Sequence, residues 1–212
     1  SSLEEAKEQT YAGFRLESGV LNTEGKSATS EDMFYTKDEF RTFIQDCRIM
    51  GVGIVPEFDM PAHALPFTRA FPEYRTKRET GGSHDYLIDE LDLSNPETTE
   101  FAKSLWSDCF EGDEPVFDEE TVIHIGTDEY HGTAGQEGNE MFRKFSADMI
   151  NFVQGTGRTV RMWGSLSNKS GTTEVPVKDV QLNVWNTGYS NPKTMYDLGY
   201  DMINTLDGSL YM

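Results

Sequence analysis

The sequence has 212 residues, which is enough for one α/β domain with a hydrophobic core of its own. Its 18 Lys and Arg stand against 37 Asp and Glu, and the net charge of −19 repels phosphate backbones, so we expect no nucleic-acid partner. The charge does not exclude neutral ligands. No stretch approaches the roughly 20 apolar residues of a membrane-spanning helix, so we expect no membrane insertion.

The first predicted helix lies in residues 35–51, YTKDEFRTFIQDCRIMG, where apolar residues recur at helical spacing. Thr36 and Glu39 form a capping box at its start, and Gly51 suits its C-terminal end. The run GVGIVPEF that follows, residues 51–58, is almost continuously apolar. Such a run is typical of a strand covered on both faces.

A loop, DMPAHALPF, and a long irregular region to about residue 93 come next. The segment 94–112, SNPETTEFAKSLWSDCFEG, predicts a helix with Asn95 as its N-cap and Pro96 at its first position. Cys47 and Cys109 fall on the apolar faces of the two predicted helices. Buried free thiols are the favoured interpretation, and a disulfide remains an alternative.

The second half of the chain continues the alternation of strands and helices. Strands are predicted at 121–130 (TVIHIGTDEY), 159–165, 180–188 and 201–206, and helices at 140–157 and 191–200. At least five strands separated by helical segments predict a parallel sheet with helical crossovers. Two arrangements fit this pattern, an open doubly wound sheet and a TIM (β/α)8 barrel.

The position of the polar and aromatic residues favours the barrel. The predicted strands end in side chains suited to function, namely Glu57, Asp59, Asp128, Glu129, Trp163, Trp185 and Tyr211. Barrel enzymes draw their sites from the carboxyl ends of several strands in this way. A doubly wound sheet would favour a glycine-rich turn after its first strand, and the sequence has neither G-x-G-x-x-G nor a P-loop. Because five strands do not close a barrel of eight, we expect residues 1–212 to be one incomplete barrel domain.

Asp128 and Glu129 stand side by side where the strand at 121–130 runs out. Acids after a strand usually cap a helix or face water, but Gly126 permits close backbone approach and His124 precedes it inside an apolar strand. Adjacent carboxylates at a buried strand end repel each other, so their pKa values are pushed apart. Glycoside hydrolysis needs such a pair.

The adjacency of the two acids bears on the mechanism. In the common retaining mechanism the two carboxyl groups lie on opposite sides of the scissile bond, about 5 Å apart, which sequence neighbours rarely achieve. A substrate with a 2-acetamido group can supply its own nucleophile, the acetamido oxygen. One acid would then orient the acetamido N–H, and the other would act as general acid and then general base.

The segments YAGFRLES, VPEFDMPAH, HIGTDE, MWGS, NVWNTG and LYM occur along the chain in this order. HIGTDE resembles the H-x-G-x-D-E signature of glycoside hydrolase family 20, the β-N-acetylhexosaminidases, and VPEFDMPAH resembles the family's P-E-x-D-x-P-G-H segment, with Ala62 where glycine is usual. The other segments also match the family in its order, and the sequence is most similar to the large multidomain bacterial enzymes of the family, including lacto-N-biosidase-like ones. The resemblance covers nearly the whole chain and implies a partial barrel, roughly strands 3 to 7 with their helices.

For catalysis, the resemblance implies three roles. Glu129 is the general acid/base, and Asp128 holds and polarises the acetamido group. Tyr211 donates a hydrogen bond to the acetamido oxygen as it attacks the anomeric carbon.

For binding, the resemblance implies aromatic walls and supporting polar groups. Trp163 and Trp185 line the acetamido pocket and the sugar face, since aromatic planes suit the apolar face of a pyranose. His63 supports the acid/base, with Asp59 nearby, and His124 lies behind the acid pair.

The expected substrate is a glycan with a terminal β-linked N-acetylhexosamine, GlcNAc or GalNAc, or a related disaccharide. We expect no cofactor and no metal, and the resemblance implies an extracellular or cell-surface location. Family members carry further strands with binding residues, so we expect this fragment alone to be inactive. The exposed barrel edges predict self-association.

Three alternatives stay open. The first is a sugar-binding module without catalysis. The second is a glycosidase whose nucleophile is a protein carboxylate, such as Glu57 or Asp207. The third is a metal-dependent barrel hydrolase, although the H-x-H pair usual in that class is missing from the sequence; its ligands would be His63, Asp59, His124 and Asp128.

Overall fold

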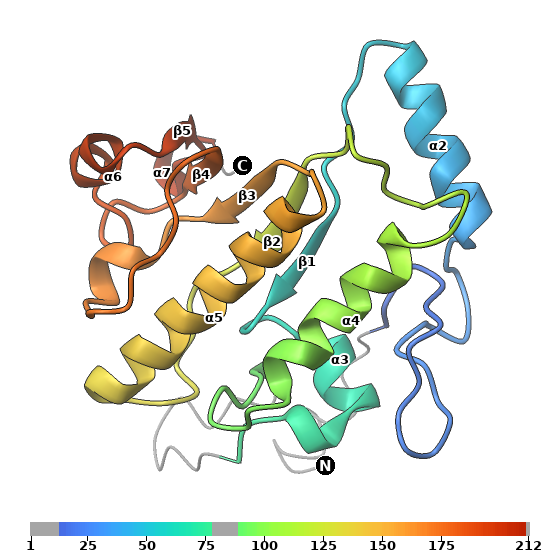
Figure 1. Cartoon of the computed structure of the whole chain (residues 1–212), viewed down its shortest axis with the longest axis horizontal. Helices are drawn as coiled ribbons and strands as arrows, with labels where there is room; N and C mark the ends of the chain where they lie inside the picture. The colour runs from blue at the N-terminus through green and yellow to red at the C-terminus, as the bar shows by residue number, and fades with distance from the viewer. Residues whose placement is uncertain (1–12, 78–88, 211–212) are drawn as a thin grey trace.

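The chain folds around a single five-stranded sheet (Figure 1). The structure is a computed structural model that describes residues 13–77 and 89–210, so the predicted site residue Tyr211 lies outside the described residues. The strands are β1 (Glu57–Met60), β2 (Ile123–Gly126), β3 (Val160–Trp163), β4 (Val180–Val184) and β5 (Asp201–Asn204).

The order of the strands decides between the two predicted architectures. All four strand pairs are parallel, and each strand pairs with the next one along the chain, from β1 to β5. A doubly wound sheet reverses its strand order at a switch point, whereas a barrel adds strands in one direction. The sheet is therefore an arc of a barrel, and among the described strands β1 and β5 each have one strand neighbour.

The helices connect the strands and cover the sheet. They are α2 (Lys37–Ile49), α3 (Leu65–Ala70), α4 (Thr98–Phe110), α5 (Gly135–Gly155), α6 (Pro192–Leu198) and α7 (Asp207–Leu210), with 3-10 turns η1 (Pro72–Tyr74) and η3 (Leu166–Asn168). Figure 1 shows α4 and α5 running side by side along one face of the sheet. No helix in the described ranges has the length and apolar character needed to cross a membrane.

The first predicted helix is confirmed, but the strand after it begins later than predicted. Thr36 and Glu39 form the predicted capping box, and Gly51 follows the end of α2 with a φ of +79°. Strand β1 begins at Glu57 rather than at residue 51. Pro56 has no N–H for a sheet ladder and contributes only its carbonyl, which accepts from the His124 N–H at 3.0 Å.

Two other helix starts also differ from the prediction. Helix α4 begins at Thr98, because the Asn95 side chain caps a preceding turn by accepting from the Glu97 N–H at 3.0 Å. Helix α5 begins at Gly135, five residues before the predicted start. Its first turn is exposed, so apolar spacing does not mark that turn in the sequence.

Aromatic packing fixes the first strand against the helical layer. Phe58 on β1 stacks on the fully buried Trp106 of α4, with 3.9 Å between ring centroids and 16° between the ring planes. The Phe14 ring packs edge-on against the Phe58 ring, with 4.9 Å between the ring centroids. Rings packed in this way typically contribute about 3–5 kcal/mol each. Cys47 and Cys109 are both free and buried, as the favoured interpretation predicted.

Candidate active site

Close contact between β1 and β2 brings their carboxyl ends together. A Cβ placed on Gly126 would overlap Asp59 Oδ1 and would lie 2.7 Å from the Met60 nitrogen. Gly126 also has a φ of +75°, a conformation that side chains disfavour. Only glycine fits here, and its absence of a side chain lets Asp59 of β1 approach the residues that follow β2.

The acid pair lies on an irregular turn rather than on an extension of the strand. Thr127 and Glu129 have φ values of +77° and +33°, both in the left-handed region. The Thr127 N–H donates to the Met60 carbonyl at 3.0 Å, which ties the turn to β1. The turn leaves 14% of the Asp128 side chain exposed and 36% of the Glu129 side chain.

His63 stands among three carboxylates. Its Nε2 lies 3.2 Å from Glu129 Oε2 and 3.7 Å from Asp128 Oδ1, and its Nδ1 lies 3.7 Å from Asp89 Oδ2. The Asp89 carboxylate is the largest influence, and with the other neighbouring carboxylates it raises the pKa of His63 to about 10. The ring is therefore an imidazolium at neutral pH and can donate to Glu129.

Asp59 and Asp128 lie close together, with one carboxyl oxygen of each within 4.8 Å of the other. Burial, and then the charge of Asp128, raise the pKa of Asp59 to about 9, so Asp59 is protonated at neutral pH. Burial raises the pKa of Asp128, and the charge of His63 together with a hydrogen bond from a protonated Asp59 counteracts that effect. Two buried carboxyl groups this close share one proton because both cannot ionise without strong repulsion.

Trp163 is held at the end of β3 by Glu57 and His124. Its Nε1 donates to Glu57 Oε1 at 2.5 Å, and its ring centroid lies 4.9 Å from that of His124. His124 is 4% exposed, and burial lowers its pKa to about 3, so the imidazole is neutral. Burial also raises the pKa of Glu57, and Glu57 Oε1 lies 3.3 Å from His124 Nδ1. Glu57 thus fixes the tryptophan.

Trp185 follows β4 and packs against Tyr189, with ring centroids 4.7 Å apart and an angle of 35° between the ring planes. Its Nε1 is buried and has no hydrogen-bond partner among the described residues. Burial, followed by the nearby Glu129 carboxylate, raises the pKa of Tyr189. Tyr189 therefore links Trp185 to the acid turn.

The structure brings some of the predicted residues into direct interaction and connects the others through a third residue. Asp59, His63, Asp128 and Glu129 interact directly. Trp163 and His124 join this group through Glu57, whose pKa responds to the Asp128 charge. Trp185 joins it through Tyr189.

Sequence reasoning missed two members of the site. Asp89 lies in a region that carries no periodic pattern, so nothing in the sequence indicated it. Tyr189 had a weak signal, an aromatic residue shortly after a strand end in WNTGY.

Among the described residues, one small set of groups could hold a cation. Asp59, His63 and Asp128 each offer one ligand atom, and these atoms lie within 4.8 Å of one another. His124, named in the metal-hydrolase alternative, is not in this set. A metal needs a neutral imidazole, and the carboxylates around His63 favour its charged form, so the set suits a proton network better than a metal.

Similar sequences occur in two kinds of enzyme. The chain is 27% identical over 191 residues to a lacto-N-biosidase of Bifidobacterium bifidum, covering 81% of this chain and 16% of the relative. It is 24% identical over 215 residues to a β-hexosaminidase of Emericella nidulans, covering 88% of this chain and 35% of the relative. The chain thus spans well under two thirds of either relative.

Solved structures share the fold. A β-N-acetylhexosaminidase from Bacteroides fragilis matches with a TM-score of 0.64 and 21% identity, over 90% of this chain and 40% of the other. A catalytic module of a pneumococcal exo-β-D-N-acetylglucosaminidase matches with a TM-score of 0.68 and 18% identity, over 92% and 55%. These matches confirm the predicted partial TIM barrel.

The family assignment rests on a match over nearly the whole chain. The model of the glycosyl hydrolase family 20 catalytic domain matches residues 9–212, which include every residue of the site described above. The motif resemblance is thereby confirmed, and the chain belongs to glycosyl hydrolase family 20.

Proposed function

We propose that the protein is a retaining exo-β-N-acetylhexosaminidase in which the 2-acetamido group of the substrate is the nucleophile. The observation that carries the proposal is that one imidazolium, His63, contacts both Asp128 and Glu129. The two acids therefore serve the same side of the site. A mechanism with a protein nucleophile would need a carboxylate on the opposite side of the scissile bond.

The two carboxylates named as alternative nucleophiles have other partners. Glu57 accepts the Trp163 N–H and has a raised pKa, which weakens it as a nucleophile. Asp207 accepts from the Asn186 side chain at 3.1 Å and from the Gly208 N–H at 2.6 Å. These contacts favour substrate assistance over a covalent enzyme intermediate.

In the first step, the acetamido carbonyl oxygen forms a bond to the anomeric carbon while the glycosidic C–O bond breaks. Glu129 gives its proton to the leaving oxygen, and the sugar becomes an oxazolinium ion. Asp128 accepts a hydrogen bond from the acetamido N–H and balances the positive charge. His63, with its Nε2 at 3.2 Å, can donate to the Glu129 carboxylate that results.

In the second step, Glu129 removes a proton from water as the water oxygen bonds to the anomeric carbon. The bond from the acetamido oxygen breaks, which restores the acetamido group. Two displacements at one carbon leave its configuration unchanged. Asp59 supports both steps because its proton is a hydrogen-bond donor that stabilises the Asp128 carboxylate in a buried position.

The aromatic residues supply the walls for the sugar. Trp163 and Trp185 stand at the carboxyl ends of the neighbouring strands β3 and β4. The acids follow the carboxyl end of β2, on the same side of the sheet. Aromatic faces suit the apolar face of a pyranose. We assign Tyr211 the donor of a hydrogen bond to the acetamido oxygen, a role that rests on the family resemblance.

The proposed substrates are glycans with a terminal β-linked N-acetylhexosamine or a related disaccharide. The similarity to both a lacto-N-biosidase and β-hexosaminidases supports this range. An extracellular or cell-surface location fits such substrates and is part of the proposal.

The decisive test is hydrolysis of 4-nitrophenyl N-acetyl-β-glucosaminide beside the plain β-glucoside, with the natural full-length protein and its Glu129→Gln variant. We expect cleavage of the acetamido sugar alone and loss of that cleavage in the variant. Equal cleavage of the plain glucoside would refute substrate assistance. A fully active Glu129→Gln variant would refute the assignment of the acid.

The 212-residue chain alone is expected to hydrolyse these substrates poorly and to self-associate. Within the described residues, β1 and β5 each have one strand neighbour, which leaves an edge for pairing on either side, and the site depends on groups placed from several strands. Gel filtration and the same assay test both points together. A monomeric chain with the turnover of the full-length protein would contradict them.

A further inference from the structure

We infer that Lys169 and Glu90 are positioning residues for Glu129. They hold the acid turn, residues 127–131, and so fix the position of the Glu129 side chain. The inference rests on the proposed function, because it gives Glu129 its task. Both side chains come from segments far from the turn in sequence, and neither carries a role in the site described above.

The acid turn needs such a clamp. Non-glycine residues with positive φ store backbone strain of about 1–3 kcal/mol each, and they persist only where the surroundings over-determine them. Thr127 and Glu129 are two such residues within three positions. The bond from Thr127 to Met60 holds the start of the turn, but it leaves the backbone after Glu129 to other contacts.

Glu90 holds the turn from one side. Its side chain is 3% exposed, and its Oε2 accepts the His131 backbone N–H at 2.9 Å. Its Oε1 lies 3.5 Å from His131 Nδ1. The neighbouring Asp89 contacts His63. Residues 89 and 90 therefore interact with both the imidazolium and the acid turn.

Lys169 holds the turn from the other side. Its Nζ donates to the Tyr130 carbonyl at 2.5 Å and lies 5.6 Å from the centroid of the Phe142 ring. Burial lowers the pKa of Lys169, and the charge of Glu90 counteracts that effect. The two clamp residues therefore hold the carbonyl and the N–H of one peptide group, the group that joins Tyr130 to His131 just after Glu129.

The loop that carries Lys169 is itself anchored to α5. Arg143 donates from Nε to the Thr173 carbonyl at 2.7 Å and from Nη1 to the Lys169 carbonyl at 3.2 Å. Glu140 accepts from the backbone N–H groups of Thr172 and Thr173. These bonds fix the backbone of the loop, so the Lys169 side chain extends to the turn from a fixed position.

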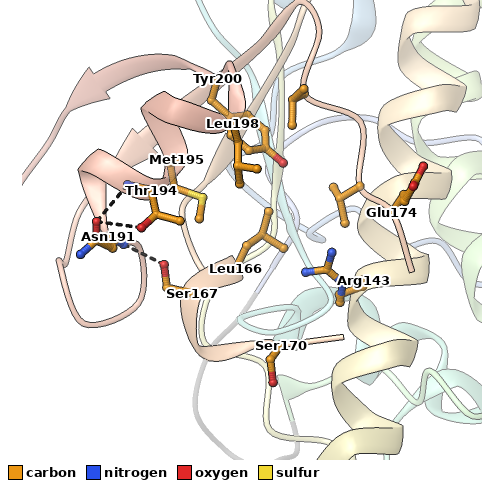
Figure 2. A pocket seen from close by; sticks show the side chains of 12 residues that line it. Arg143, Leu166, Ser167, Ser170, Glu174, Asn191, Thr194, Met195, Leu198 and Tyr200 are labelled. Atoms are coloured by element: carbon orange, nitrogen blue, oxygen red, sulfur yellow. Dashed lines mark hydrogen bonds between the residues drawn. The ribbon is translucent and has the colours of Figure 1, made fainter. Parts of the chain in front are cut away.

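Hydrogen bonds matter here because packing behind the loop is incomplete. A pocket of about 570 Å³ lies between this loop, α5 and α6. Figure 2 shows Arg143 on α5 beside this pocket, with Leu166, Ser167 and Ser170 of the loop also at its wall. Polar contacts from α5 thus hold the loop in addition to the packing of Leu166 in the core.

A loosened clamp should affect proton donation more than folding. Glu129 would still bind substrate but would point less accurately at the leaving oxygen, and small displacements of catalytic groups carry large rate costs. Substrates with poor leaving groups need the proton, whereas activated aryl leaving groups do not. The ratio of the two rates therefore reports the position of Glu129.

The test uses the natural full-length protein and two disrupting variants, Lys169→Met and Glu90→Met, with Lys169→Arg and Glu90→Gln as conservative counterparts. Lys144→Met is the matched control, because Lys144 lies exposed on α5 and pairs only with Asp148 among the described groups. The substrates are the methyl and 2,4-dinitrophenyl N-acetyl-β-glucosaminides. Thermal unfolding verifies that each variant is folded.

We expect kcat for the methyl glycoside to fall at least tenfold more than kcat for the dinitrophenyl glycoside in both disrupting variants. The conservative variants should recover most of the ratio, and Lys144→Met should leave it unchanged. An equal fall for both substrates, or no fall, would overturn the inference.

Amide hydrogen exchange gives a second readout that does not need activity. Exchange at residues 127–131 should accelerate at least tenfold in Lys169→Met and stay unchanged in Lys144→Met. If the wild-type protein cleaves neither glycoside, the proposed function fails, and the exchange rates still decide whether the clamp exists. Unchanged exchange in Lys169→Met would refute it.

Discussion

Replacement of Asp59 by asparagine tests the proton that Asp59 and Asp128 share. The amide has the shape of a protonated carboxyl group and cannot ionise. In the folded protein the pKa of Asp59 is about 9, against 3.8 for the free group. The folded state therefore binds a proton that the unfolded state releases between these two values, and the stability of the wild type falls as pH rises through this window.

The size of the effect follows from the linkage. Each pH unit above 3.8 costs up to about 1.4 kcal/mol, so at pH 7 the upper bound is about 4 kcal/mol. Because Asp128 and His63 share the charge of the site, we expect about 2–3 kcal/mol. Asp59→Asn should match the wild type near pH 4 and be more stable by that amount at pH 7.

The assay is urea unfolding of both proteins at pH 4, 5.5, 7 and 8, followed by tryptophan fluorescence. The difference in unfolding free energy should grow with pH. A constant difference across this range, or a variant that loses stability at pH 7, would refute the reasoning. Asp59→Ala is the control, because it removes both the proton and the donor to Asp128.

Three further predictions concern the same site. Gly126→Ala should lower the unfolding free energy by about 2–4 kcal/mol, because its Cβ would meet Asp59 and the Met60 backbone and its φ is positive; a urea midpoint equal to wild type would contradict this. The pKa of His63 rises from 6.5 to about 10 on folding, so its contribution to stability is complete below pH 6.5 and is lost as pH rises through 10. His63→Gln should therefore flatten the wild-type decline in unfolding free energy between pH 6.5 and 10, and an unchanged slope would count against the assignment. Metal analysis should find no stoichiometric ion, and EDTA should leave hydrolysis unaffected; one bound zinc whose removal abolishes activity would restore the metal-hydrolase alternative.

The sequence predicted the barrel because two signals agreed. Periodic apolar segments identified the elements, and polar residues at the ends of several predicted strands favoured the barrel over the doubly wound sheet. The boundaries were weaker where local chemistry decided them. Pro56 delays β1, and Asn95 caps a turn rather than α4.

The site was predictable as a set of residues but not as a network. The motifs named Asp59, His63, Asp128 and Glu129, yet nothing in the sequence showed that Asp59 would lie beside Asp128. That pairing depends on how tightly β1 and β2 approach each other at Gly126. Lys169 was equally hidden, because a lysine in a loop carries no pattern until the fold brings it to Tyr130.

The adjacency of Asp128 and Glu129 is best explained by the turn that carries them. The positive φ of Glu129 breaks the regular course of the chain, so consecutive side chains enter different surroundings. Asp128 lies in the buried group with Asp59, whereas Glu129 is more exposed and lies beside His63. In the proposed mechanism, Asp128 balances the charge of the cationic intermediate, and Glu129 exchanges protons with the leaving group and with water. A strand continued through these residues would have placed them on opposite faces of the sheet, and only one could then have reached the substrate.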